Sequence, residues 1–419
     1  MNSRRAIFSW CLYDWANSAF STVISTFIFS VYFARGIYGD ATAGSAVWGY
    51  ALGFAGIGVA LMSPVLGAVA DRAGRRKPWL AVLVALTVLP VALLWYARPS
   101  PDYVTYALVC VVLASVAFEL ANVFYNAMLN DIAPPDKLGR VSGWAWGAGY
   151  AGGLGCLGLA LVGFVQPETP WFGLGKANGE NIRATAPLVA LWFVVFAVPL
   201  FVFTPDVPRS GLGLRAAIGA GLRQLRDTLR DVRRYRAIVL FLIASALYRD
   251  GLATLFAMGG LYAAGAFSMS FEQILIFAIA LNVAAGVGAA GFGWIDDWLG
   301  SRRTVMLSLI GLMGFGVPVL LVEDARLFVA LAVGLGIFVG PAQAAGRSFM
   351  ARISPPAMET EMFGLYAFAG KSVAFLGPIL FALATDAFDS QRAGMSVVFL
   401  FFLAGALVLR HVPEAEKTV

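Results

Sequence analysis

The fold is decided by Gly67-Ala68-Val69-Ala70-Asp71-Arg72-Ala73-Gly74-Arg75-Arg76, a stretch that the chain contains twice. The second copy is Gly293-Trp294-Ile295-Asp296-Asp297-Trp298-Leu299-Gly300-Ser301-Arg302, 226 residues later, and both copies follow the spacing G-x-x-x-D-x-x-G-x-R. A second pair of segments, Ile132 to Pro135 and Ile353 to Pro356, repeats at an offset of 221 residues. The chain is therefore predicted to consist of two related halves.

The composition indicates that both halves lie in a membrane. Of the 419 residues, 60% are hydrophobic and 13% are charged, whereas a soluble domain is about half apolar and a quarter charged. Apolar runs long enough to cross a bilayer recur from end to end. We expect twelve spans, near residues 8–34, 45–70, 79–97, 103–129, 141–165, 185–204, 237–263, 272–295, 304–322, 326–350, 361–384 and 393–411. The predicted fold class is an all-α polytopic membrane protein with two pseudo-symmetric bundles of six helices.

The predicted domains are an N-terminal bundle (1–204), a linker (205–236) and a C-terminal bundle (237–419). Within the linker, residues 209–236 hold eight Arg against two Asp, and apolar residues recur at helical spacing. We expect an amphipathic basic helix that rests on anionic lipid headgroups rather than on nucleic acid. If both termini lie in the cytoplasm, the cytoplasmic segments hold 21 Lys and Arg and the external segments hold six. Because Lys and Arg are enriched in cytoplasmic loops, this difference predicts that both termini are cytoplasmic.

The residue types needed for metal binding or covalent catalysis are scarce. The chain has one histidine, His411, and three cysteines, all within apolar runs and without metal-ligand spacing. We therefore expect no metal, no cofactor and no enzymatic activity. Two symmetric halves of six helices are typical of a transporter, and a polytopic membrane enzyme is the alternative to a transporter. Gly147 to Gly152 spells G-x-G-x-x-G inside an apolar run, which predicts close helix packing rather than a dinucleotide site.

Ionised side chains at six positions fall well inside the predicted spans, where a charge is costly and points to function. They are Asp14, Glu119, Arg249, Asp250, Arg347 and Lys371. The three basic residues all belong to the second half, whereas Asp14 and Glu119 belong to the first. Opposite charges would therefore meet across the centre, either as fixed ion pairs between the halves or through a bound ligand.

Polar residues near these charges follow helical spacing. Asp14, Asn17, Ser18, Ser21 and Ser25 would form one stripe, Glu119, Asn122 and Asn126 a second, and Gln343 and Arg347 an i, i+4 pair. Burial favours the protonated form of a carboxylic acid unless a cation compensates, so Asp14 and Glu119 are candidates to carry a coupling proton. Arg347 lies nearer the cytoplasmic end, where its side chain could extend to the membrane surface. An offset of 236 pairs Asp14 with Asp250.

The repeated stretch, from Gly67 to Lys77 and again from Gly293 to Arg303, resembles the loop signature of the major facilitator superfamily. The resemblance implies two bundles that rock about a central cavity lined by the first, fourth, seventh and tenth helices. It also implies a cytoplasmic gate in which Asp71 and Asp297 pair with helix ends across the interface. The implied gate residues are Gly67, Asp71, Arg72, Gly74, Arg75, Arg76, Gly293, Asp297, Gly300 and Arg302.

Three further segments, "YDWANSAF" from Tyr13, "YRDG" from Tyr248 and "FGLYAFAGKSVAFLGP" from Phe363, resemble the vacuolar-effluxer-like family. Its fungal members are associated with amino-acid efflux from the vacuole, and this compact chain resembles the bacterial members. The resemblance implies a transporter, which we expect as a monomer in the plasma (bacterial inner) membrane.

The charge pattern suits a small polar solute that carries both signs. We expect amino acids or related zwitterions, with the ammonium near Asp14 or Glu119 and the carboxylate near Arg249 or Lys371. Transport would be coupled to protons or sodium, and efflux is compatible with the family resemblance. A small organic anion moved with a proton is the alternative.

Overall fold

The computed structural model describes residues 4–231 and 233–414. Within these ranges all regular structure is helical, and twelve helical segments are long and apolar enough to cross a membrane. They are Arg4–Ile37, Ala41–Ala73, Lys77–Tyr96, Pro101–Ile132, Pro135–Val165, Glu180–Phe203, Arg236–Phe267, Glu272–Leu299, Ser301–Leu321, Ala325–Ile353, Glu359–Phe388 and Gln391–Leu409. The predicted all-α class with twelve spans is confirmed.

The helices of the first half run from α1 to α9. They are α1 (Arg4–Ala19), η1 (Phe20–Phe27), α2 (Phe29–Tyr32), η2 (Phe33–Ile37), α3 (Ala41–Ala73), α4 (Lys77–Leu93), η3 (Leu94–Tyr96), η4 (Pro101–Tyr103), α5 (Val104–Ala127), α6 (Leu129–Ile132), η5 (Pro135–Lys137), α7 (Leu138–Ala160), η6 (Leu161–Val165), η7 (Trp171–Gly173), α8 (Glu180–Arg183) and α9 (Thr185–Phe203).

The linker helix is α10 (Leu214–Arg230), and the second half runs from α11 to α17. Its helices are α11 (Arg236–Phe267), α12 (Phe271–Leu299), α13 (Ser301–Leu321), α14 (Ala325–Ile353), α15 (Glu359–Val373), α16 (Leu376–Phe388) and α17 (Gln391–Leu409). The limits predicted for the two domains, residues 204 and 237, stay predictions.

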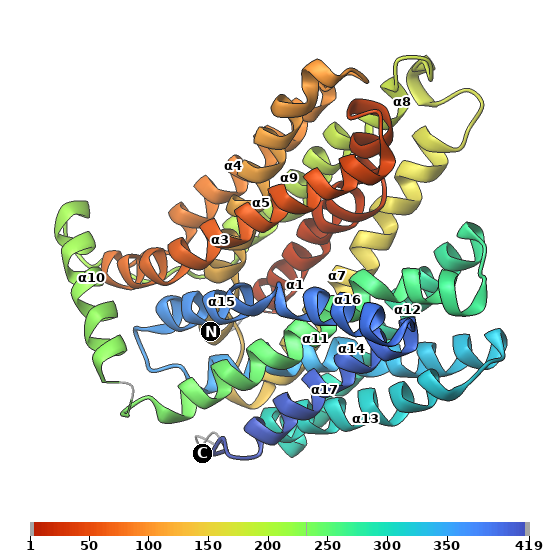
Figure 1. Cartoon of the computed structure of the whole chain (residues 1–419). Helices are drawn as coiled ribbons and strands as arrows, with labels where there is room; N and C mark the ends of the chain where they lie inside the picture. The colour runs from red at the N-terminus through yellow and green to blue at the C-terminus, as the bar shows by residue number, and fades with distance from the viewer. Residues whose placement is uncertain (1–3, 232, 415–419) are drawn as a thin grey trace.

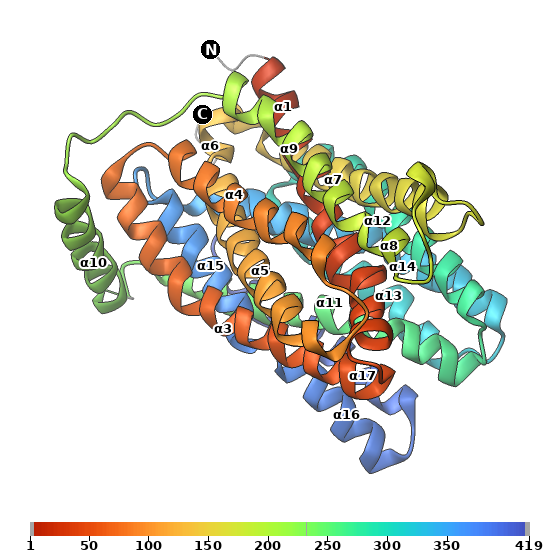
Figure 2. The same ribbon diagram turned by 90° about the horizontal axis from the view of Figure 1, so that it is seen from above.

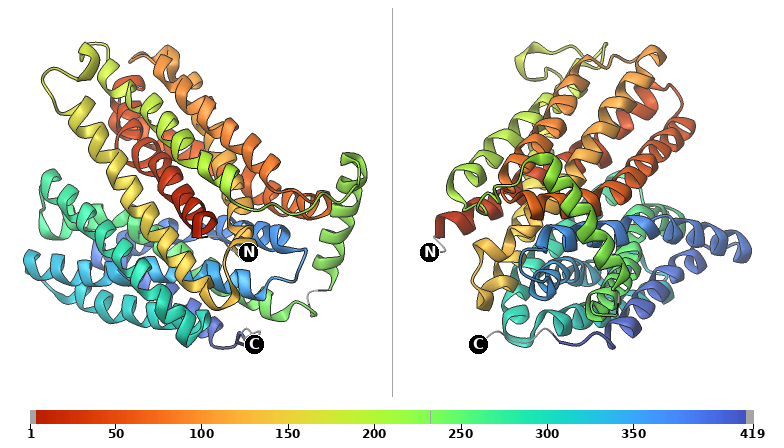
Figure 3. Two further views of the ribbon diagram at one scale, coloured as in Figure 1. Left: turned by 180° about the vertical axis from the view of Figure 1, so that it is seen from behind. Right: turned by 90° about the vertical axis from the view of Figure 1, so that its left-hand side faces the viewer.

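The two halves form a V. Figure 1 shows helices α1 to α9 as one bundle and α11 to α17 as the other, meeting near both chain termini and diverging away from them, and Figure 3 shows the same divergence from behind. We call the end that holds Arg4, α10 and Glu414 the terminal face, and the end that holds Ala41, α8 and Phe388 the far face. The most extensive contacts between the halves are those of α3 with α15 and of α7 with α12.

Glycine allows these helices to approach closely. A β-carbon on Gly143 of α7 would lie 2.4 Å from the carbonyl oxygen of Ala289 on α12, and one on Gly152 would lie 2.3 Å from that of Trp15 on α1. Real side chains do not tolerate such distances, so both positions need glycine. The segment Gly147 to Gly152 therefore serves helix packing, as predicted, and lies inside α7.

Several spans depart from a regular α-helix, among them the first and the eleventh. The first span continues from α1 into η1, which is π-helical and thus winds more widely than an α-helix. The eleventh span is broken at Ala374 and Phe375 into α15 and α16. Interruptions of this kind inside a membrane span often mark functional positions.

The linker helix α10 lies against the first half at the edge of the molecule, as seen in Figure 2. A β-carbon on its Gly221 would meet the backbone of Val69 on α3 at 2.7 Å. Its Gln224 side chain donates to the carboxylate of Glu361 on α15. The helix therefore touches both halves at the terminal face. Its leucines Leu214, Leu222 and Leu229 are exposed, as a helix lying on a membrane surface requires.

Candidate functional site

A cavity of about 370 Å³ lies between the halves, at the level where the V begins to open. Eight of the ten predicted substrate- or proton-binding residues line it: Asp14, Asn17, Glu119, Asn122, Asn126, Arg249, Gln343 and Arg347. They come from α1, α5, α11 and α14, which belong to the first, fourth, seventh and tenth spans. Aromatic side chains complete the wall, among them Phe118, Trp146, Phe256, Phe363 and Tyr366.

The floor of the cavity is an ion pair between the halves. Arg347 Nη1 lies 2.8 Å from Asp14 Oδ2. The same guanidinium donates to Ser142 Oγ at 2.9 Å, to the Ser142 carbonyl at 2.7 Å and to Asn126 Oδ1 at 3.3 Å. All of these acceptors belong to the first half, so one arginine of α14 holds α1, α5 and α7 together with the second half.

Arg347 does not extend to the membrane surface as the sequence had suggested. Its side chain is 4% exposed, and its guanidinium lies 4.8 Å from the ring centroid of Trp10, 5.5 Å from that of Trp146 and 5.7 Å from that of Tyr125. The carboxylate of Asp14 and these aromatic faces offset the cost of burying the cation, which explains why the side chain points inward.

A second ion pair between the halves stands at the cavity wall. Lys371 Nζ of α15 lies 2.7 Å from Glu119 Oε1 of α5, and the two side chains are 30% and 34% exposed. Lys371 itself is outside the cavity lining, although its partner Glu119 belongs to the lining. Because both groups keep contact with solvent, this pair is weaker than the buried pair of Asp14 and Arg347.

Arg249 differs from the other two cations because no carboxylate pairs with it among the described residues. It stacks on Tyr366, with 4.3 Å from its guanidinium carbon to the ring centroid, and donates one hydrogen bond, from Nη1 to the Tyr366 carbonyl at 3.2 Å. The remaining N–H groups face a cavity that also holds Glu119 and Asn122. This guanidinium is therefore positioned to bind an anionic group of a ligand.

Asp250, next in sequence, points away from the cavity. Its Oδ2 accepts the backbone N–H of Gly377, in the first turn of α16, at 2.9 Å, and the residue is 2% exposed. Adjacent residues of an α-helix point about 100° apart, so Arg249 faces the cavity while Asp250 faces α16.

The polar stripe on the first span ends earlier than its α-helical spacing predicts. Asp14, Asn17, Ser18 and Ser21 line the cavity, and Asn17 Nδ2 donates to Asn122 Oδ1 at 3.1 Å. Ser25 is not part of the lining. It lies within η1, where the wider winding rotates later residues off the α-helical stripe.

On the terminal side of the floor, the first copy of the repeated stretch closes the space between α3 and α15. Asp71 accepts the backbone N–H groups of Thr360 and Glu361, at the start of α15, at 3.1 and 2.8 Å. Arg76, 4% exposed, pairs with Asp131 of its own half and with Glu359 of the other, the latter at 2.9 Å. Acidic groups at a helix N-terminus are stabilised by its unpaired N–H groups and dipole.

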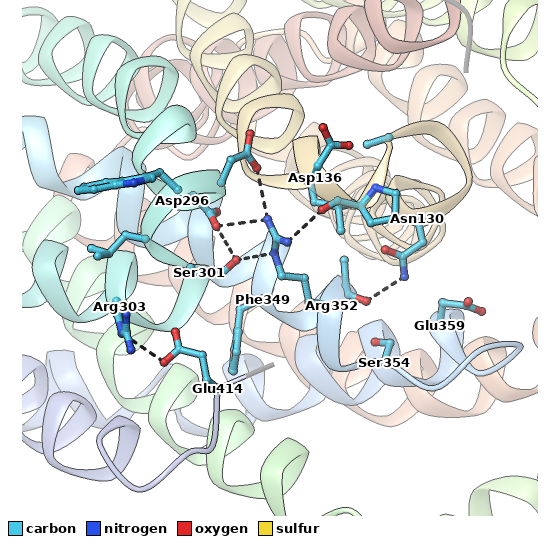
Figure 4. Close-up of a pocket in the computed structure, with 18 of the residues that line it drawn as sticks. Asn130, Asp136, Asp296, Ser301, Arg303, Phe349, Arg352, Ser354, Glu359 and Glu414 are labelled. Carbon is cyan, nitrogen blue, oxygen red and sulfur yellow. Dashed lines mark hydrogen bonds and ion pairs between the residues drawn. The ribbon is translucent and has the colours of Figure 1, made fainter. Parts of the chain in front are cut away.

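The second copy closes the space between α12 and α7 in the same way. Asp297 accepts the N–H groups of Gly139 and Arg140, at the start of α7, at 2.8 and 3.2 Å, and Arg140 Nε at 2.7 Å. Figure 4 shows Arg352 of α14 between the two halves, donating to Ser301 at 2.9 Å and to the Pro135 carbonyl at 3.0 Å. The surrounding pocket measures about 800 Å³ and opens at the terminal face.

The predicted gate residues do not all meet. Asp71, Arg76 and Asp297 lie at the contact between the halves, and Gly67 packs there so closely that a β-carbon would be 2.4 Å from the Thr360 carbonyl. Gly74 and Gly300 take positive φ, 90° and 98°, where α3 and α12 end. Gly293 packs on Arg140. Arg72 and Arg75 are exposed, and Arg302 pairs with Glu414 of its own half at 3.1 Å.

Sequence reasoning missed Arg140 and Arg352, which are the arginines at the second contact, together with Asp131 and Glu359 at the first. A signal was present, because the 221-residue offset carries Gly139 and Arg140 onto Thr360 and Glu361. These are the two pairs of residues whose N–H groups bind Asp297 and Asp71.

The comparisons with known proteins agree with this geometry. The family model described as "Vacuole effluxer Atg22 like" matches residues 36–418. An uncharacterized MFS-type transporter of Bacillus subtilis, YxiO, is 28% identical over 415 residues, which are 98% of this chain and 95% of that protein. Autophagy-related protein 22 of Kluyveromyces lactis is 24% identical over 57% of this chain, and the match spans about half of that longer protein.

Solved structures share the fold at low sequence identity. The proton:xylose symporter XylE superposes with a TM-score of 0.76 at 13% identity, covering 99% of this chain and 96% of that one. The E. coli fucose:proton symporter FucP gives 0.72 at 12%, covering 98% of both chains. Fold and family are those of a transporter, not of an enzyme. The chain belongs to the vacuole effluxer Atg22-like family and has the major facilitator fold.

Proposed function

We propose that the protein is a monomeric secondary active transporter that moves a small zwitterion, with amino acids as the favoured substrates, by alternating access. The observation that carries this proposal is the cavity between the halves, in which an unpaired guanidinium, Arg249, shares the wall with the carboxylate of Glu119. A solute with one carboxylate and one ammonium can pair with both groups, its ammonium replacing Lys371 as the partner of Glu119, whereas an uncharged solute leaves Arg249 without a counter-charge.

The terminal face is proposed to be cytoplasmic, in the plasma (bacterial inner) membrane. The excess of Lys and Arg in its loops and in α10 supports this orientation, and the same arginines are proposed to contact anionic lipid headgroups. The V then opens to the outside, and the contacts of Asp71, Arg76 and Asp297 close the cytoplasmic side. Separating these contacts while the far face closes would present the cavity to the cytoplasm.

Coupling to a cation gradient is the second part of the proposal. A substrate that replaces one ion pair by another changes the balance between two conformations by its differential affinity for them. Protons are favoured over sodium because two of the solved transporters that share this fold, XylE and FucP, are proton symporters. Efflux and uptake use the same cycle in opposite directions, so the gradient decides the direction of net transport.

The test is counterflow in proteoliposomes preloaded with unlabelled solute, using a panel of radiolabelled L-amino acids, small dicarboxylates and sugars. We expect exchange of one or more amino acids, reduced at least tenfold in Arg249→Gln because the carboxylate loses its partner. Arg249→Lys, which keeps the charge but not the planar geometry, should fall between. Exchange of sugars alone, unaffected by Arg249→Gln, would overturn the proposal.

A small organic anion is the second candidate, favoured by the same guanidinium and by Lys371 at the cavity wall. The panel separates the two, since an anion needs no partner for an ammonium group. Dicarboxylate exchange that survives Glu119→Gln, with no exchange of amino acids, would establish the anion as substrate instead.

A further inference from the structure

One buried acid of the second half differs from every other acid near the cavity. Asp250 is 2% exposed, and its Oδ1 has no hydrogen-bond partner among the described residues. Thr254, one turn further along α11, is fully buried and its hydroxyl is likewise without a partner in the described parts of the chain. Both oxygens pack closely on Gly377, where a β-carbon would lie 1.9 Å from Thr254 Oγ1 and 3.1 Å from Asp250 Oδ1.

The other two carboxylates considered as proton carriers are already neutralised by cations. Asp14 is paired with Arg347 at 2.8 Å and Glu119 with Lys371 at 2.7 Å. An ion pair favours the charged form of a carboxylate. Both carboxylates therefore have a counter-charge in this conformation, whereas no ion pair to the buried Asp250 is found in residues 4–231 and 233–414.

Apart from Arg249, which precedes Asp250 on α11 and lines the cavity, the charged groups on α11 and on the elements packed against it are occupied elsewhere or lie near helix ends. On α15 Lys371 pairs with Glu119, and on α14 Arg347 pairs with Asp14. On α17 Arg392 donates to the Val322 carbonyl at 3.0 Å. The others are Arg249 on α11 itself, Glu272, Asp296 and Asp297 on α12, Arg326 and Arg352 on α14, Glu359 and Glu361 on α15, and Asp386 on α16.

An unpaired carboxylate in such a site is costly as an ion, and protonation removes the charge. The Gly377 N–H at the start of α16 binds Oδ2 in either protonation state, whereas Oδ1, which has no hydrogen-bond partner among the described residues, is free to carry the proton. A metal cation fits poorly, because the N-terminal end of α16 is the positive end of its dipole.

We propose that Asp250 carries the coupling proton, held on Oδ1 beside Thr254 and released when α16 moves relative to α11. The assignment rests on the proposed function, that is, on proton-coupled transport, and it names the residue that takes up the proton. The proton comes from water on the far side and leaves to water on the terminal side, so no other reactant is needed. The break at Ala374 and Phe375 lets α16 move separately from α15, whose start is bound to Asp71 of the first half.

The primary test needs no knowledge of the substrate. Difference infrared spectra of the protein in lipid bilayers, wild type minus Asp250→Asn at neutral pH, report the carbonyl stretch of a protonated carboxylic acid. Asparagine has the same size and still accepts the Gly377 N–H, so the variant keeps the contact to α16 but cannot titrate. We expect this band to be lost in Asp250→Asn and kept in Asp14→Asn. A spectrum in which Asp250→Asn removes no such band would overturn the assignment.

Transport then separates coupling from structure. In proteoliposomes, using whichever panel solute shows counterflow in the wild type, Asp250→Asn should exchange that solute within twofold of wild type. Its accumulation driven by a pH gradient should fall at least tenfold. The proposal would be contradicted if Asp250→Asn accumulated the solute as well as the wild type does, or if it lost exchange and accumulation to the same extent. If no solute exchanges in the wild type, the proposed function fails while the infrared result for Asp250 still stands or falls by itself.

Discussion

The closed contact at the terminal face can be weakened at a single glycine. Gly67 of α3 faces α15, and a β-carbon at this position would lie 2.4 Å from the Thr360 carbonyl oxygen and 2.9 Å from Glu361 Cα. Both neighbours are backbone atoms at the start of a helix, so neither can rotate away. Gly67→Ala therefore forces α15 to retreat by about 1 Å or abolishes the contact.

The size of the effect follows from the cost of overpacking, about 1–3 kcal/mol. Alanine also favours the helix by up to ~1 kcal/mol relative to glycine, but this gain applies to open and closed conformations alike and cancels in their ratio. The penalty applies only where α3 and α15 touch. The population ratio should shift by about 5–150-fold toward conformations in which the terminal face is open.

Distance distributions between spin labels measure this shift. Thr42, at the start of α3, and Asp386, near the end of α16, are both exposed at the far face. Labels on Thr42→Cys and Asp386→Cys, in a background with the native cysteines replaced by alanine, should come closer together in Gly67→Ala as the far face closes. Gly53→Ala is the matched control, because no atom lies within 4 Å of a β-carbon there. Unchanged distances in Gly67→Ala, equal to those of Gly53→Ala, would refute the reasoning.

Three further outcomes are expected, for the second terminal-face contact, for the buried ion pair and for α10. Asp297→Asn should destabilise the second terminal-face contact by about 1–3 kcal/mol. A cysteine introduced by Asn130→Cys at the pocket should then react faster with a thiol reagent. Gly53→Ala, tested with the same cysteine, should leave the labelling rate unchanged. Arg347→Lys keeps the charge but loses most of the donors to Ser142 and Asn126, so the melting temperature should fall by an amount equivalent to about 1–3 kcal/mol. Replacing Arg223, Arg226 and Arg230 by Gln should remove a stimulation of counterflow by phosphatidylglycerol over phosphatidylcholine, since each arginine contributes about 1 kcal/mol to binding anionic lipid.

The sequence predicted those features that are determined within a single helix. Apolar runs gave the twelve spans, and helical spacing placed Asp14, Asn17, Asn122 and Asn126 on inward faces. It could not say which charges would pair, because Asp14 and Arg347 are 333 positions apart. Their distance depends on how two bundles are set against each other, and periodicity within a helix carries no information about that.

Local departures from regular helix geometry and from the repeat are a second reason why single residues are misplaced by sequence patterns. Ser25 was assigned to the cavity stripe by α-helical spacing, and only the π-helical winding of η1 removes it. Arg302 was assigned to the gate by its place in the repeat, yet it pairs with Glu414 beyond α17. A repeated motif therefore predicts contacts with the backbone, such as a carboxylate that binds the N–H groups at a helix start, more reliably than it predicts the partners of long flexible arginines.

The two ion pairs between the halves differ in a way that connects binding to motion. The side chains of Asp14 and Arg347 are 12% and 4% exposed, whereas those of Glu119 and Lys371 are about a third exposed. A zwitterion near Glu119 can offer its ammonium to the glutamate and its carboxylate to Lys371 or Arg249, which replaces the ion pair without changing the net charge. In the proposed cycle, the exposed pair is therefore the one that substrate exchanges, and the buried pair is the one that keeps the floor closed.

This distinction can be measured with a double-mutant cycle of Glu119→Gln and Lys371→Met. In the free protein, the coupling free energy between the two sites, measured by thermal unfolding, should be at most about 1 kcal/mol, as for other partly solvated pairs. Under the proposed function, substrate affinity should fall at least tenfold in each single variant, because each removes a group with which the zwitterion is proposed to pair. A large coupling energy with unchanged affinity would mean that Glu119 and Lys371 only hold the halves together, and the recognition of a zwitterion would then have to rest on Arg249 and Asp14.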